Sequence, residues 1–186
     1  MAGWAEVLEH LVRERRPALV RYAALLTGGD LREADDLVQE ALLRTFSRGR
    51  PLREVAAAEG YVRQAILRAF VDGYRRRRHW RTLQHLVAMP DVAPPPAAED
   101  AVDVRRALAT LRPRLRACVV LRFYDDLTVA EIGDRLGLAE GTVKRYLSDA
   151  VGELETLLGP LPDARAEISV VQHVGSGHVG SGEVGR

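Results

Sequence analysis

Four adjacent arginines at positions 75–78 form the densest cluster of charge in the sequence, and aromatic residues lie on both sides of it. From Tyr61 to Trp80 there are six arginines and a single acidic residue, Asp72. Guanidinium groups neutralise phosphates, and aromatic rings such as that of Tyr74 can stack on unpaired bases. These residue types could therefore hold a single strand of nucleic acid.

Other interpretations of the same residues stay open at this point. A basic helix face that meets only water would have the same composition. A helix lying on a membrane surface is disfavoured, because the apolar stripe of this segment is short and has its own domain to pack against. A nuclear-import signal would account for the arginines but not for the aromatic residues. The segment alone does not decide between nucleic acid and solvent.

The arginines lie toward the end of the third of three helices predicted for the first half of the chain. Apolar residues recur at helical spacing over about 4–26, 31–47 and 60–86, with a loop before residue 60 and no alternation typical of strands. Asp30 should cap the second helix, and Glu33 three residues later completes a capping-box pattern. The expected buried stripes are Val7, Leu8, Leu11, Val12, Leu19, Tyr22, Ala23 and Leu26; Ala34, Leu37, Val38, Ala41, Leu42 and Phe46; and Val62, Ala65, Ile66, Ala69 and Phe70.

The second of these helices also carries polar residues beside its apolar stripe. These are Asp35, Asp36, Gln39 and Glu40, and an apolar residue that lies off the buried stripe, Leu43, follows them. Such a patch is commonly a solvated surface, and it could also be a face that docks on another protein.

The composition changes at residue 87. Residues 87–103 contain four prolines and four acidic residues but no basic residue. Consecutive prolines fix an extended backbone and remove hydrogen-bond donors, so this segment is predicted to be a semi-rigid linker.

Beyond the linker the sequence predicts a helix-turn-helix. Pro113 should divide the helical run at 104–123, and Thr128 with Glu131 forms a second capping box. The helix that follows should bury Ala130, Ile132 and Leu136, and Gly137 supplies the turn to a helix with Val143, Leu147, Val151 and Leu154 on its inner face.

The outer face of the second helix of this motif would meet bases in a major groove. An ordinary helical hairpin with a solvated charged face is the alternative. Charge does not separate the two, because residues 103–158 contain equal numbers of basic and acidic residues. Ala139 stands where a side-chain cap would be expected. The positions on the outer face are Glu140, Gly141, Thr142, Lys144, Arg145 and Ser148.

Several classes of protein are disfavoured. No apolar run approaches the length of a membrane span, and the single cysteine, Cys118, allows no internal disulfide, which fits a reducing cytoplasm. Cys118 lies among apolar residues and is expected to be a buried, inert thiol. No arrangement of residues suggests catalysis, a bound metal or a cofactor. We expect an all-α, non-enzymatic chain with two small helical domains at 1–86 and 104–159, a Pro-rich acidic linker at 87–103 and a disordered tail at 160–186.

Three motifs in this order resemble the extracytoplasmic-function sigma factors of bacterial RNA polymerase. The first is EADDLVQEALLRTF, with the core Asp36 to Glu40. The second is YVRQAILRAFVDGYRRRR, in which Asp72, Arg75 and Arg76 match a D-x-x-R-R run. The third is LTVAEIGDRLGLAEGTVKRYLSDA, in which residues 141–144 match a G-T-V-K motif.

The resemblance implies partners and roles. The first motif would dock on the β′ clamp helices of the polymerase core through Asp35, Asp36, Leu37, Gln39, Glu40 and Leu43. The second would hold the melted minus-ten strand through Tyr61, Arg68, Asp72, Tyr74, Arg75, Arg76, Arg77, Arg78 and Trp80, and the loop at 50–59 would help to choose a base. The outer face of the helix-turn-helix would read the minus-thirty-five element. The β flap of the polymerase core is a further expected partner. An anti-sigma protein is a further expected partner.

Two positions depart from the family pattern. The family usually has asparagine at the position of Arg68 and often has arginine at the position of Asp149. Two other functions also fit the residues: a stand-alone helix-turn-helix regulator of duplex DNA, and an adaptor between proteins whose charged faces never meet DNA.

Overall fold

The computed structural model describes residues 3–47, 54–83, 101–164 and 166, and all regular elements in this part of the chain are helices. The predicted all-α class is confirmed. The chain divides into two compact units, Met1–Pro113 and Arg114–Arg186. The predicted linker up to residue 100 and the predicted tail from residue 167 lie outside the described residues.

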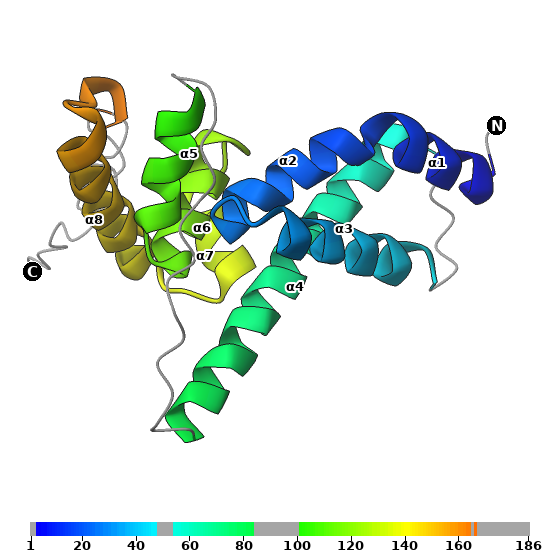
Figure 1. The fold of residues 1–186 in the computed structure, drawn as a ribbon, viewed down its shortest axis with the longest axis horizontal. Coiled ribbons are helices and arrows are strands. Elements are labelled where there is room, and N and C mark those ends of the chain that lie inside the picture. Colours follow the sequence, from blue (N-terminus) through cyan, green and yellow to red (C-terminus); the bar gives the residue numbers. More distant parts are fainter. Residues whose placement is uncertain (1–2, 48–53, 84–100, 165, 167–186) are drawn as a thin grey trace, which may run out of the picture. The chain divides into compact units, whose positions relative to one another are not determined.

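The first unit is built around three helices, α2 (Arg16–Thr27), α3 (Leu31–Phe46) and α4 (Val55–Leu83), which pack against one another. α1 (Trp4–His10) precedes them and α5 (Ala101–Thr110) is grouped with them. In Figure 1 the last turns of α4 project beyond α2 and α3. The apolar stripes interlock in the core, where the most completely buried residues are Leu11, Leu19, Tyr22, Ala23, Leu26, Ala34, Val38, Ala41, Ala58, Val62 and Ile66.

The first predicted helix is interrupted by a π-helix, η1 (Leu11–Arg15), so the expectation of one continuous helix was wrong. Pro17, at the start of α2, has no N–H to donate, and its ring would clash with the carbonyl of Arg13, four residues earlier. A π turn widens the helix here and shifts the phase of its side chains. Val12, which α-helical spacing placed on the buried face, is accordingly 46% exposed.

α4 begins at Val55, five residues before the predicted start, so the expected loop up to Glu59 was also wrong. Its first turns contain three alanines, which favour a helix, and Ala58 is buried against the core. Gly60 suggested a boundary in the sequence, but a side chain there would meet open space. α4 nevertheless continues through this glycine without interruption. Ala65, expected in the core, is only partly buried, whereas Leu67 is buried.

The ends of α2 and α3 follow the sequence signals. Gly28 ends α2 in the left-handed conformation, with a φ of 75°. The Asp30 carboxylate then accepts hydrogen bonds from the backbone N–H groups of Arg32 (2.9 Å) and Glu33 (3.0 Å) at the start of α3. The predicted N-cap is confirmed, and it satisfies two backbone donors that the helix itself leaves without acceptors.

The second unit contains α6 (Pro113–Phe123), α7 (Val129–Leu136) and α8 (Glu140–Leu158). Pro113 begins α6 and separates it from α5, as predicted. The predicted inner face of α8 is buried, with Leu147 1% exposed. In α7 the expectation for Ala130 was wrong. Val129, not Ala130, shares the buried face with Ile132 and Leu136, because these three are spaced by three and four residues.

Cys118 lies in the core of the second unit and is fully buried, as predicted. Burial raises the pKa of its thiol to about 12, which outweighs the opposing effect of the positive charge on Arg114. The thiol therefore stays protonated at neutral pH and is a poor nucleophile.

The turn between α7 and α8 depends on two glycines. The predicted capping box starts α7: the Thr128 N–H donates to Glu131 Oε2 (2.9 Å) and the Glu131 N–H donates to Thr128 Oγ1 (3.3 Å). Gly137 ends α7 with a left-handed φ of 64°. Gly133 lets the chain return closely, because a Cβ at this position would lie 2.7 Å from the carbonyl oxygen of Leu138.

We predict that Gly133→Ala destabilises the second unit. The new methyl group would force the Leu138 carbonyl away and weaken the hydrogen bond from the Leu138 N–H to the Gly133 carbonyl (2.9 Å). The expected loss in the free energy of unfolding is about 1–3 kcal/mol, measured by urea denaturation.

The matched control is Gly152→Ala in α8. A Cβ at Gly152 would meet nothing within 4 Å, so alanine should increase the free energy of unfolding by about 0.5–1 kcal/mol through its better helix propensity. Equal stability of the two variants would contradict the proposed close approach at Gly133.

Candidate protein and nucleic-acid interfaces

The first predicted interface lies on the outer side of α3. Asp36 and Gln39 are exposed, and the Leu43 side chain is 71% exposed. Spaced by three and four residues, they share one face of the helix. We call the five residues Asp35, Asp36, Gln39, Glu40 and Leu43 the acidic face of α3. Leu37, the sixth residue predicted for this interface, is only 7% exposed and belongs to the core.

Part of the acidic face is already held in ion pairs. Both carboxylate oxygens of Asp35 accept hydrogen bonds from Arg16 Nη2 (2.6 and 2.8 Å), and Gln39 Nε2 donates to the same carboxylate at 3.0 Å. Glu40 pairs with Arg44 one turn along α3 (2.6 Å). These pairs fix the side chains in position and leave Asp36 and Leu43 as the prominent exposed groups.

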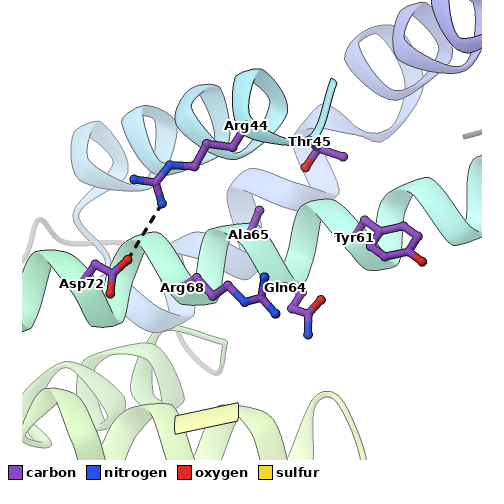
Figure 2. Close-up of a pocket in the computed structure, with 7 residues that line it drawn as sticks. All are labelled: Arg44, Thr45, Tyr61, Gln64, Ala65, Arg68 and Asp72. Carbon is purple, nitrogen blue, oxygen red and sulfur yellow. Dashed lines mark ion pairs between the residues drawn. The ribbon is translucent and has the colours of Figure 1, made fainter. Parts of the chain in front are cut away.

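A pocket of about 540 Å³ lies between α3 and α4 (Figure 2). Three of the residues predicted to hold a melted strand line it: Tyr61, Arg68 and Asp72. The pocket brings these together with four residues that were not predicted as a site, Arg44 and Thr45 from α3 and Gln64 and Ala65 from α4.

Helical periodicity could have identified two of the four missed residues. Gln64 and Ala65 lie three and four residues after Tyr61, and so share its side of α4. Nothing in the sequence marks Arg44 and Thr45, because only the packing of α3 against α4 brings them to the pocket.

Arg44 stands between the acidic face and the pocket. Its Nη2 pairs with Glu40 (2.6 Å), and its Nη1 lies 4.0 Å from Asp72 Oδ2 on α4. Figure 2 shows the Asp72 carboxylate directed at Arg44, whereas the guanidinium of Arg68 extends toward the Gln64 amide.

The arginine run continues α4 beyond this pocket. Arg76 is exposed and Tyr74 is partly buried on helical backbone. Arg75, Arg77, Arg78 and Trp80 lie on the same helix, but their side chains fall outside the described part of the structure.

A cluster that the sequence did not predict holds the first turns of α4 against η1. Glu59, 8% exposed, accepts from Arg15 Nε (2.7 Å) and from Arg63 Nη2 (3.0 Å). The Arg63 guanidinium also lies 5.5 Å from the centre of the Tyr22 ring. Burial alone would raise the pKa of Glu59, but the hydrogen bonds and charges of the two arginines together lower it below its usual value of 4.5.

The outer face of α8 presents the residues predicted for duplex DNA. Glu140, Gly141, Arg145 and Ser148 are exposed, whereas Thr142 and Lys144 are partly buried. Ala139, at the N-cap of α8, provides no side-chain hydrogen bond to the helix. The Arg145 guanidinium lies 5.5 Å from the centre of the Tyr146 ring. Asp149, further along the helix, is exposed.

Within the described residues no group of three or more His, Cys, Asp or Glu side chains is arranged to hold a metal ion. The helices found there are also too short or too polar to cross a membrane.

Comparison with known families matches both units. The family described as Sigma-70 region 2 matches residues 11–81, which include α2, α3 and most of α4. The family described as Sigma-70, region 4 matches residues 101–154, which include the helix-turn-helix.

Individual relatives align over nearly the whole chain. The RNA polymerase sigma-E factor of Streptomyces coelicolor is 33% identical over 169 residues, covering 87% of this chain and 93% of the relative. The ECF RNA polymerase sigma factors SigM and SigL of Mycobacterium tuberculosis are each 31% identical; they cover 87% and 86% of this chain, and the alignments span 82% and 93% of those proteins.

A solved structure is also similar. It is the sigma factor RpoE of Bartonella quintana, crystallised in complex with the anti-sigma factor NepR. The TM-score is 0.59 at 25% identity, over 81% of this chain and 94% of the other. Region 2 over α2–α4 and region 4 over the helix-turn-helix define an RNA polymerase sigma factor. The chain belongs to the extracytoplasmic-function family of these factors.

The lowered pKa of Glu59 generates a prediction about stability and pH. A carboxylate whose pKa is lower in the folded than in the unfolded state stabilises the fold above the unfolded value and loses this contribution as the pH falls through the folded value. We expect Glu59→Gln to reduce the free energy of unfolding by about 1–3 kcal/mol at neutral pH, and the difference from the native chain to shrink below pH 4.5.

Urea denaturation at a series of pH values measures this difference. Glu9→Gln is the control, because Glu9 is 65% exposed in its pair with Arg13 and should contribute little at any pH. A difference between Glu59→Gln and the native chain that is independent of pH would contradict the assignment.

Proposed function

We propose that this sigma factor uses the two sides of α3 for two tasks. The acidic face contacts the polymerase core, and the pocket between α3 and α4 receives the melted minus-ten strand. The observation that carries the proposal is the pocket itself, because it gathers Tyr61, Arg68 and Asp72 beside the arginine-bearing end of α4.

The acidic face suits a protein partner. The exposed Leu43 at one end of the face supplies apolar contact area, and the carboxylates that precede it on α3 favour a basic surface on the partner. Its ion pairs with Arg16 and Arg44 hold the side chains before any partner binds, which reduces the entropy lost on association.

The pocket and the end of α4 suit an unpaired strand. Tyr61, 43% exposed, offers a ring on which a base can stack, and the exposed Arg76 can meet a phosphate. A pocket that admits a base out of the stack would favour the melted strand over the duplex, and this preference would help to open the promoter.

In the second unit, α8 would read the minus-thirty-five duplex. The exposed Arg145 and Ser148 and the partly buried Lys144 and Thr142 are suited to phosphates and base edges, and α7 lies against α8 as in a helix-turn-helix. The exposed Asp149 repels phosphate, so the first turns of α8 would make most of the contacts.

The remaining elements of the proposal follow from membership of the family. The polymerase would supply the chemistry of nucleotide addition, and this chain would act without a cofactor in the cytoplasm. The β flap of the polymerase core would be a further contact. An anti-sigma protein would cover the same surfaces; the Bartonella quintana relative was crystallised with such a protein. Residues 87–103 would link the two domains.

We expect Leu43→Ala to weaken binding to core polymerase about tenfold, because it removes the exposed apolar side chain of the acidic face without disturbing the fold. Competition against labelled native sigma factor for core enzyme measures the affinity. Leu31→Ala is the control, since Leu31 is also a largely exposed leucine (63%), at the start of the same helix. Equal effects of the two variants would contradict the docking face.

We expect Arg76→Ala to weaken binding of holoenzyme to a forked promoter fragment and to lower the salt dependence of that binding by about 0.7 in log–log slope. The reason is the loss of one phosphate contact to a single strand. Arg13→Ala is the control, because Arg13 is equally cationic and exposed but lies on η1. An unchanged slope for Arg76→Ala would place this arginine outside the DNA path.

A further inference from the structure

We propose that the end of α4, residues 73–83, is a helix that its nucleic-acid ligand completes. In the free chain these residues exchange between helix and coil, and phosphates bound to the arginines favour the helix. We call residues 73–83 the α4 extension. The inference rests on the proposed function, since it takes the ligand to be promoter DNA, and it adds a conformational step to the binding of that ligand.

The packing of α4 against the rest of its unit ends before the extension. Six apolar residues of the helix are buried: Ala58, Val62, Ile66, Leu67, Ala69 and Phe70. Among the later residues whose side chains the structure describes, none is buried. In Figure 1 the last turns of α4 likewise project beyond α2 and α3. Because helices in proteins gain most of their stability from a packed apolar face, the extension must rely on its own helix propensity.

That propensity is weak at the point where the packing ends. Gly73 has no Cβ and loses more conformational freedom in a helix than any other residue type. Gly60 lies in the same helix, but the buried Ala58 and Val62 hold the backbone on both sides of it. Beyond Gly73 only residues 74–83 remain, and a helix of fewer than about 12 residues is marginal in water without tertiary contacts.

Charge weakens the extension further. Residues 75–81 contain five arginines and no acidic residue. On a helical backbone Arg75 and Arg78, three residues apart, and Arg77 and Arg81, four residues apart, are neighbouring like charges. The helix dipole attracts cations near a C-terminal end, but this attraction acts only within the last turn. The repulsion therefore extends over more of the segment than the attraction does.

A phosphate chain reverses this effect of charge. Phosphates that lie among the arginines replace repulsion between cations by attraction between opposite charges. A ligand that binds the helical form better than the coil raises the population of the helix. Part of the binding free energy is then used to order the extension, so a chain whose extension is already helical should bind more tightly.

Hydrogen exchange of the free, full-length chain tests the first half of the inference without DNA. We expect the amides of residues 74–83 to exchange at least about a hundredfold faster than those of residues 62–70, which lie in the packed part of the helix. When the holoenzyme binds a forked promoter fragment, exchange at residues 74–83 should slow at least about tenfold. Equal protection of the two parts of α4 in the free chain would overturn the inference.

The substitution Gly73→Ala tests the second half. Alanine favours the helix, so exchange at residues 74–83 in the free chain should slow, and the holoenzyme should bind the forked fragment about threefold more tightly. Gly60→Ala is the matched control. It is the same substitution in the same helix, and a Cβ there would meet nothing within 4 Å. It should stabilise the fold and leave the affinity for the fragment unchanged.

Two results with these variants would contradict the inference. Equal affinities of the Gly73→Ala and Gly60→Ala holoenzymes would mean that ordering of the extension is not linked to DNA binding. Weaker binding by Gly73→Ala would mean that the DNA approaches the backbone at this glycine, so that its small size and not its low helix propensity matters. Failure of the native holoenzyme to bind the fragment would instead overturn the proposed function.

Discussion

The packing of α3 between α2 and α4 is the constraint on which the first unit depends. One stripe of the helix, which includes Ala34, Val38 and Ala41, must stay buried against both neighbours. The small alanines allow the helices to approach closely, and the rotation of α3 about its axis is thereby fixed. The remaining circumference divides into the acidic face on one side and the wall of the pocket on the other. The packing of this one helix therefore fixes both surfaces, for which we propose different partners.

The features that the sequence predicted are those encoded within one or two helical turns. The buried stripe of α8, the caps at Asp30 and Thr128 and the division at Pro113 all depend on neighbours a few residues away. The pairing of Glu59 with Arg15 joins residues 44 positions apart, which periodicity does not report. Pro17 accounts for the π-helix, but a proline is also common in the first turn of an ordinary α-helix, so the sequence alone does not predict the π turn. The pocket is partly predictable. Helical spacing places Tyr61, Gln64 and Arg68 on one side of α4, whereas only the packing of α3 against α4 brings Arg44 and Thr45 to them.

Two sets of arginines in the first unit differ in their surroundings. Arg15 and Arg63 are committed to Glu59, and their loss would leave a nearly buried carboxylate without its partners. Arg76 at the end of α4 is exposed. The first group holds the helix that displays the second. Amino-acid composition does not distinguish the paired arginines from the exposed one, because all of them are the same residue type.

Arg44 contacts both surfaces of α3, because Glu40 on the acidic face and Asp72 at the pocket share its guanidinium. The two carboxylates pair with different nitrogens of this one cation, so a change at Glu40 would also alter the electrostatic potential of the pocket. Substitutions at these positions should not contribute additively to the free energy of binding at either surface. A double-mutant cycle across Glu40 and Asp72 would measure their thermodynamic linkage. Under the proposed function, the affinity for polymerase and the affinity for DNA would therefore both depend on Glu40, Arg44 and Asp72.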